Sequence, residues 1–177
     1  IDSILHLLRI VEDNFSYDSV FAFLKSGAIA DMEADEIEEL ENYVLARGIK
    51  GFKLWNKPWE DSVEEIRAYF MEAVLPFYDR VKGNKVCINE YADAMYSFME
   101  NLSYEERMKE EGDLYNKLVS LLEKMKEIMG SRCVKIDEFS ELIDLGLKDI
   151  SLGMIPGKLD MVTIGDITRT RLEDIKV

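Results

Sequence analysis

The sequence predicts a mainly α-helical domain of several helices, with one short β segment near the C-terminus. Apolar residues recur at spacings of three and four through most of the chain, which is the period of a helix with one buried face. Gly, Asn and Ser separate these runs, as expected of helix ends and turns. One short apolar run, Met161 to Ile164, ends in Gly165-Asp166 and has the length of a buried strand.

Three helices are predicted in the first part of the chain, over residues 2–12, 17–25 and 32–47. Ser16 precedes the second helix, where its hydroxyl can accept a hydrogen bond from a free backbone N–H. Gly48 follows the third helix and supplies the left-handed conformation in which many helices end. Residues 49–58 are then predicted to form a loop or a short extended piece.

The sequence pattern in the middle of the chain predicts further helices. One begins near Pro58-Trp59, with Asp61 or Ser62 as its cap, and runs past Pro76, where the missing N–H predicts a kink. The others are expected over residues 89–102, over 103–129 as one helix or two with Gly112 as the weak point, and over 138–148 with Asp137 as the cap. The strand at 161–164 would pair with partners mostly outside the chain.

Composition favours a single domain in a reducing compartment. Of 177 residues, 47% are hydrophobic, which is enough for a core, and no stretch approaches the length needed to span a bilayer. Cys87 and Cys133 are the only cysteines, and their distance apart suggests free thiols more than a disulfide framework. We therefore expect a cytoplasmic protein without membrane contact.

The charge argues against a nucleic-acid-binding domain of the ordinary basic kind. Lys and Arg total 22 against 36 Asp and Glu, a net charge of −14, and such a field repels phosphate. Any DNA contact must therefore come from a local patch. The best candidate follows the third helix and comprises Arg47, Lys50, Lys53, Trp55 and Lys57.

This segment combines cations with aromatic rings and contains no acid. Lysines can bind phosphates, and Trp55, with Phe52 and Trp59, could stack on bases or sugars. In the alternative interpretation these aromatic residues anchor the core and the lysines are merely solvated. Seven acids between Asp31 and Glu41 would weaken the patch if they lay beside it, and we interpret them as a solvated helix face.

A second candidate lies after the predicted strand. Arg169 and Arg171 are two residues apart, so in an extended chain both side chains point to the same side. They could bind a phosphate or pair with carboxylates. His6 is the only histidine, which argues against a histidine-based metal site or nucleophile. We predict no catalytic, metal-binding or nucleotide-binding residues in this chain.

Several segments, in order along the chain, resemble one family of proteins. Residues 40–51 match the pattern Leu-Glu-Asn-Tyr-x-Leu-x-x-Gly-Ile-x-Gly, and residues 162–171 match an apolar strand, Gly-Asp, and then Arg-x-Arg. Further matches lie at 7–11, at 17–25, at Ile155-Pro156 and at Leu159-Asp160. These blocks resemble the B subunit of the bacterial two-subunit ATP-dependent helicase/deoxyribonuclease (AddB/RexB type).

The resemblance implies a piece of a larger protein, and the chain, which starts at Ile1 within a helical pattern, fits that expectation. It implies the edge of a superfamily 1 helicase-like second lobe at 1–30, a helical 2B-type insertion at 31–155, and a return strand and loop at 156–177. The His and Lys-Gly that normally follow the return strand are absent, which argues against motor activity in this lobe.

The resemblance also implies a function, a set of cofactors and partners. The parent would use ATP, Mg²⁺ and an iron–sulfur cluster, none bound by this segment, and would repair double-strand breaks by homologous recombination. Its partners would be the A subunit and double-stranded and single-stranded DNA. This domain would guide DNA and pack against other domains, or alternatively serve as a protein–protein scaffold without DNA contact.

Overall fold

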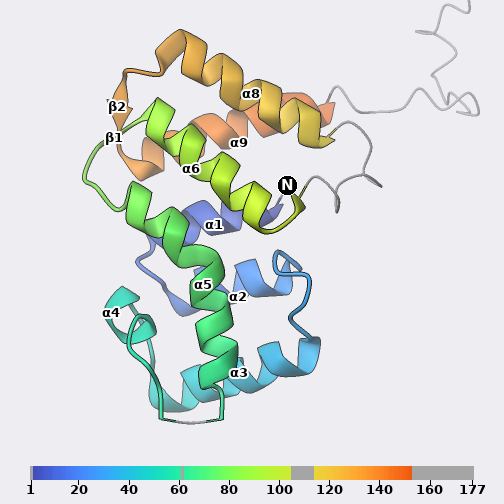
Figure 1. Ribbon diagram of the computed structural model, residues 1–177, viewed down its shortest axis with the longest axis vertical. Helices are drawn as coiled ribbons and strands as arrows, with labels where there is room; N and C mark the ends of the chain where they lie inside the picture. The colour runs from blue at the N-terminus through green and yellow to red at the C-terminus, as the bar shows by residue number, and fades with distance from the viewer. Residues whose placement is uncertain (1, 61, 105–113, 153–177) are drawn as a thin grey trace, which may run out of the picture.

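The computed structural model describes residues 2–60, 62–104 and 114–152, and it confirms a mainly α-helical fold (Figure 1). The described elements are α1 (Asp2–Glu12), α2 (Tyr17–Lys25), α3 (Ala34–Arg47), α4 (Phe52–Trp55), α5 (Glu64–Val81), β1 (Val86–Cys87), α6 (Ile88–Asn101), α8 (Leu114–Met129), β2 (Cys133–Val134) and α9 (Ile136–Leu152). Within these ranges no helix is both long enough and apolar enough to cross a membrane.

The helices form two groups joined by α5. Figure 1 shows α6, α8 and α9 at one end and α3 and α4 at the other, with α1, α2 and α5 between them. α5 packs on α6 and α3, and α1 packs on α2, α5 and α9. One continuous core contains buried side chains from Ile4 to Leu147. The two N-terminal helices therefore share a core with the rest, and the predicted boundaries at residues 30 and 155 stay predictions.

The first three helices follow the sequence prediction because their ends depend on local signals. The side chain of Ser16 accepts a hydrogen bond of 3.2 Å from the N–H of Ser19 and caps α2. Gly48 adopts the left-handed conformation (φ 62°, ψ 36°) that ends α3. The third helix begins two residues later than predicted, with Glu33 and Glu36 forming a reciprocal capping box.

Several boundaries predicted for the later helices differ from those in the structure. α5 begins at Glu64, after the predicted caps Asp61 and Ser62, whereas its continuation through Pro76 is as predicted. α9 begins at Ile136, so Asp137 lies in its first turn instead of capping it. The short helix α4 lies inside a segment that we predicted to be loop or extended chain.

A two-stranded antiparallel sheet was not predicted. Val86 pairs with Val134 and Cys87 with Cys133, so the sheet connects the start of α6 to the start of α9. Two-residue strands carry no readable alternation, which is why the sequence did not reveal them. The strand expected at 161–164 lies outside the described residues.

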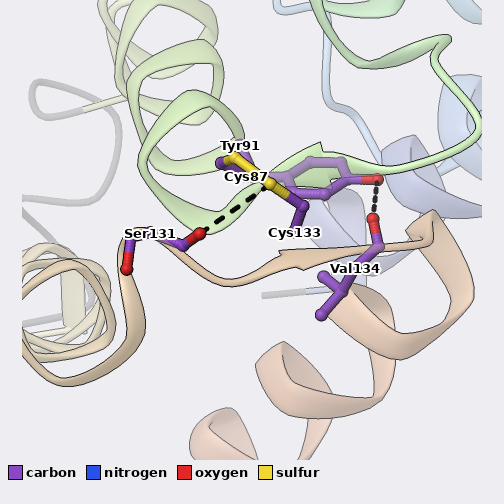
Figure 2. The surroundings of a disulfide bond; sticks show 5 residues. All are labelled: Cys87, Tyr91, Ser131, Cys133 and Val134. Carbon is purple, nitrogen blue, oxygen red and sulfur yellow. Dashed lines mark hydrogen bonds between the residues drawn. A yellow bond between two sulfur atoms is a disulfide. The ribbon is translucent and has the colours of Figure 1, made fainter.

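The sheet also corrects the prediction that the cysteines are free thiols. Their register places Cys87 and Cys133 directly opposite each other, and the structure joins them in a disulfide (Figure 2). Tyr91 lies beside the disulfide, and its hydroxyl donates a hydrogen bond of 3.5 Å to the carbonyl of Val134. Sequence separation alone is misleading here, because folding brings the two residues together.

This disulfide predicts a redox-dependent stability. A cross-link between residues 46 positions apart restricts the unfolded chain, and such bonds stabilise by about 2–4 kcal/mol. We expect the oxidised chain to unfold at a correspondingly higher urea concentration than the chain treated with reductant. The double variant Cys87→Ser/Cys133→Ser is the control, because reductant should not change its unfolding. Identical unfolding curves for chains that mass spectrometry shows to be oxidised and reduced would contradict the prediction.

Candidate nucleic-acid interface

The basic segment predicted from the sequence forms a sharp, anchored turn between α3 and α5. Gly51 has a φ of 85°, which favours glycine, and its N–H donates to the carbonyl of Phe15 at 3.1 Å. The next N–H, of Phe52, donates to Oδ1 of Asn14 at 3.4 Å. The turn is thus bonded to the loop between α1 and α2. Its backbone is held in place by a segment nearly 40 residues away in the chain.

Trp55 anchors this turn from inside. Its side chain is fully buried, at 0% exposure. The centre of its ring lies 5.2 Å from the ring centre of Phe70, 5.3 Å from that of Trp59 and 6.4 Å from that of Phe21. An enclosed ring has no free face on which a base could stack. Trp55 therefore belongs to the core, and the prediction that it contacts DNA is corrected by its burial.

A buried arginine ties the C-terminal end of the turn to α5. Arg67, only 7% exposed, donates from Nη1 to the carbonyl of Trp55 at 2.6 Å. Its Nε and Nη2 donate to the two carboxylate oxygens of Glu64, each at 2.6 Å. Glu64 in turn accepts the N–H of Trp59 at 2.7 Å. This bidentate arrangement satisfies the buried guanidinium, which would otherwise be costly.

The same contacts determine the protonation of Glu64. The hydrogen bonds from Arg67 hold the pKa of this carboxyl below its ordinary value of 4.5, and the backbone N–H of Trp59 adds to the effect. Burial acts in the opposite direction but is outweighed. Glu64 therefore remains ionised, and the ion pair with Arg67 persists, through the neutral range.

The remaining aromatic rings of the segment are committed to neighbours. Trp59 stacks on Tyr43 with ring centres 5.1 Å apart, and Phe52 stacks on Tyr78 at 4.2 Å. The guanidinium of Arg47 lies 5.2 Å from the centre of the Tyr43 ring. The interpretation of these aromatics as anchors of the turn is thus favoured over the interpretation as base-stacking platforms.

The lysines remain available to a ligand. Lys50, Lys53 and Lys57 are exposed, and none of them makes an ion pair with an acid of the described ranges. Together with Arg47 they form what we call the basic turn: Arg47, Lys50, Lys53 and Lys57. An arrangement of cations on a rigid turn, without an exposed aromatic platform, suits contacts with phosphates more than contacts with bases.

The acids of α3 lie mainly toward the other end of that helix. Asp35 and Glu36 occupy its first turn, whereas Arg47 occupies its last, a distribution that complements the helix dipole. Glu41 is the acid of α3 nearest to Arg47 in the sequence, and it is six residues away, which is about 9 Å along a helix and close to the Debye length of about 8 Å at physiological salt. The acids therefore weaken the basic turn less than adjacent charges would.

Other predicted site residues are not brought to this turn. Arg169 and Arg171 lie outside the described residues, so their role stays a prediction. Within the described ranges, no group of three or more His, Cys, Asp or Glu side chains could hold a metal ion. Glu64 and Arg67 were not predicted as site residues, although their spacing of three residues near a helix start is typical of an ion pair.

Comparisons with known proteins identify the relatives of this chain. No protein-family model matches it. Over 98% of its length it is 30% identical to the B subunit of the ATP-dependent helicase/deoxyribonuclease of Clostridium novyi, and over 97% it is 32% identical to that of Clostridium acetobutylicum. Over nearly its whole length the chain is thus similar to a segment of the helicase/deoxyribonuclease B subunits. A third B subunit, from Lachnoclostridium phytofermentans, is 29% identical over 96% of the chain.

The matched region is a minor part of each relative. The alignments cover 17% of the proteins from C. novyi and L. phytofermentans and 18% of that from C. acetobutylicum. The chain thus spans less than a fifth of the length of the curated relatives that it matches. Its basic turn overlaps and follows residues 40–51, one of the blocks that carry the resemblance to this family.

Proposed function

We propose that this chain is a non-catalytic domain of a helicase/deoxyribonuclease B subunit, which guides DNA through phosphate contacts of the basic turn. The observation that carries the proposal is the basic turn itself, whose lysines are exposed while its backbone is bound to Phe15, Asn14 and Arg67. Because the turn is already ordered, binding would cost little conformational entropy.

The wider role of the parent protein is part of the same proposal. Its relatives are named as the B subunit of an ATP-dependent helicase and deoxyribonuclease, so an A subunit and DNA are the partners we infer. From the family resemblance, and not from the cysteines, which form a disulfide, we place the parent in the cytoplasm, in the repair of double-strand breaks by homologous recombination, with ATP, Mg²⁺ and an iron–sulfur cluster bound by its other parts. This chain would act on double-stranded or single-stranded DNA during that process.

The acidic net charge shapes how such a contact would work. A net charge of −14 repels DNA from most of the surface, so binding has to be local and strongly weakened by salt. Non-specific attraction elsewhere on the chain would be suppressed. We therefore expect a weak, oriented contact that positions DNA without reading its sequence.

The test is a titration of labelled DNA with the chain. Anisotropy of duplex-end, forked and single-stranded DNA is measured at low and moderate salt. Four phosphate contacts predict a slope of about −3.6 for log affinity against log salt on duplex DNA, from about −0.9 per contact. Replacing Lys50 and Lys53 by glutamate should weaken binding at least about tenfold at low salt and reduce the slope by about 1.8.

A matched variant controls for the change in net charge. Lys85 and Lys135 are also exposed and adjoin the sheet, at the other end of the fold from α4 (Figure 1). Lys85→Glu/Lys135→Glu alters the net charge by the same amount. If the two double variants weaken DNA binding equally, overall charge and not the basic turn is responsible.

A second candidate function is a protein–protein scaffold that does not contact DNA. It is favoured by an acidic, partly apolar groove along α3, described below. This function predicts no DNA binding even at low salt, where attraction to phosphate is strongest. The same titration therefore separates the two candidates.

A further inference from the structure

A groove runs along one side of α3, between that helix and the end of α2. Its wall on α3 consists of one helical stripe: Ala34, Ile37, Glu38, Glu41, Asn42 and Leu45. The opposite wall comes from α2 and the loop that follows it: Leu24, Lys25, Gly27 and Met32. The groove has a volume of ≈ 580 Å³. Its length from Ala34 to Leu45 is about 16 Å, or three helical turns.

The groove has an apolar floor and an exposed apolar rim. Leu24 and Met32 are buried, at 2% and 8% exposure, and belong to the hydrophobic core. Leu45 at the far end is 58% exposed, although Leu40 and Val44 of the same helix are buried. A single exposed leucine is ordinary on a protein surface, but one that continues an apolar groove is typical of a binding site.

The charge of the groove is negative, and this determines what it can accept. Lys25 is the only cation among the described residues that line it, and its Nζ lies 2.6 Å from Oε1 of Glu41. The same carboxylate accepts a hydrogen bond of 2.5 Å from the hydroxyl of Tyr17. Lys25 is thus neutralised by a partner within the fold. Glu38 has no ion-pair partner among the described residues, and it contributes an uncompensated negative charge.

A further acid of α3 adds to the negative field near the groove. Asp35 is exposed and lies three residues before Glu38. Glu36 and Glu39 lie on the face of α3 that is turned toward α5, where they line a second pocket with Ser62 and Tyr69, so they act on the groove only at longer range. DNA and acidic partners are therefore repelled from this side of the molecule, and a cationic partner is attracted.

We propose that this groove binds an amphipathic helix of a partner protein, with an apolar stripe flanked by Lys or Arg. The apolar side chains of the helix would lie on Leu24 and Met32 and against Leu45, and its cations would face Glu38 and the acids beside it. Three turns of groove match the short helices that bind in this way, through residues spaced three and four apart. The proposal does not depend on DNA binding by the basic turn.

The charge argues against a second copy of this chain as the occupant. In a symmetric dimer the same surface meets itself, so the acids of one copy would meet a surface that carries the same acids. Juxtaposed like charges oppose association. A partner of opposite charge has no such penalty.

The test measures binding of a defined probe to the whole 177-residue chain. The probe is a fluorescent peptide of about 14 residues, with leucines at the helical spacings of three and four and lysine at the other positions. Its control peptide replaces every lysine with glutamate. We expect the lysine peptide to bind at least about tenfold more tightly than the glutamate peptide, with an affinity that falls as salt rises.

Two pairs of variants locate the binding. Leu45→Asp should lower the affinity for the lysine peptide at least about tenfold, which is the effect of losing a residue central to an interface. Leu145→Asp is its control, because Leu145 is similarly exposed, at 64%, but lies on α9 at the other end of the fold (Figure 1). Glu38→Lys should also weaken binding, whereas Glu127→Lys, on α8, should not.

Three results would overturn the proposal. One is equal affinity for the two peptides, or no binding of either. Another is an equal effect of Leu45→Asp and Leu145→Asp, with circular dichroism showing both variants folded. The third is a dimer of the chain, detected by sedimentation, that Leu45→Asp dissociates, because the occupant would then be a second copy.

Discussion

Replacing Trp55 with alanine is expected to lower the free energy of unfolding by about 3–5 kcal/mol, the range for removing a large aromatic side chain from a core. The ring is fully buried against Phe21, Trp59 and Phe70, so its removal leaves a cavity. Urea unfolding of the whole chain, monitored by circular dichroism, measures the change. The loss of one tryptophan makes fluorescence unsuitable as the only probe.

The neighbouring leucine supplies the control for this experiment. Leu54 is 42% exposed and lies in the same short helix, so Leu54→Ala should cost less than about 1 kcal/mol. Trp55→Phe should be intermediate, because it retains an aromatic ring in the core. If Trp55→Ala unfolded at the same urea concentration as the unaltered chain, the tryptophan would not be the anchor that the structure describes.

The second large effect is expected for Arg67→Met, which should cost about 3 kcal/mol, at the lower end of the range for breaking a buried ion pair. Methionine retains much of the side-chain volume but none of the guanidinium donors. The carbonyl of Trp55 would lose its charged donor, and Glu64 would be left half-buried without its cation. Arg67→Lys is the informative comparison, because lysine keeps the charge but cannot form the bidentate contact.

The pH dependence provides an independent check on the same ion pair. The pKa of Glu64 is lowered in the folded chain, so its stabilising effect is complete above the unfolded value, near 4.5. That effect is lost as the pH falls through the lower pKa of the folded state. The unaltered chain should therefore lose more stability than Arg67→Met when the pH is lowered from about 6 toward about 3. Parallel pH profiles for the two proteins would contradict the assigned cause of the shift.

Trp55→Ala and Arg67→Met also test how the basic turn is held in place. Each variant removes contacts that support the turn, and neither changes one of its cations. If phosphate binding needs a preordered turn, Arg67→Met should weaken DNA binding at temperatures where the chain remains folded. A variant that loses stability but retains full DNA affinity would show that the lysines act without this support.

The basic turn and the groove assign different partners to two surfaces of α3, the turn that follows its C-terminus and the side that carries the groove. Asp35 and Glu36 begin the helix, and Arg47 ends it. DNA would be attracted to the C-terminal end and a cationic helix to the side that carries Glu38. If both proposals hold, changes at Lys50 and Lys53 should leave peptide binding unchanged, and Leu45→Asp should leave DNA binding unchanged.

The amino-acid sequence by itself determined the helical fold and the ends of its first helices. Ser16 and Gly48 act on backbone atoms within a few residues of themselves, so their effect can be read without knowing the fold. Apolar spacings of three and four likewise predicted helices with one buried face. The resemblance to the helicase/deoxyribonuclease B subunits, confirmed by relatives matching nearly the whole chain, also came from sequence.

Tertiary structure alone decided which residues of the predicted site are available. A tryptophan between lysines has the same pattern whether it stacks on bases or anchors a core, and only the packing around Trp55 distinguishes the two. The disulfide and the two-residue strands likewise depend on contact between Cys87 and Cys133, which are 46 positions apart. Local patterns predict structure that depends on neighbouring residues, whereas burial and pairing between distant segments are determined only when the whole chain folds.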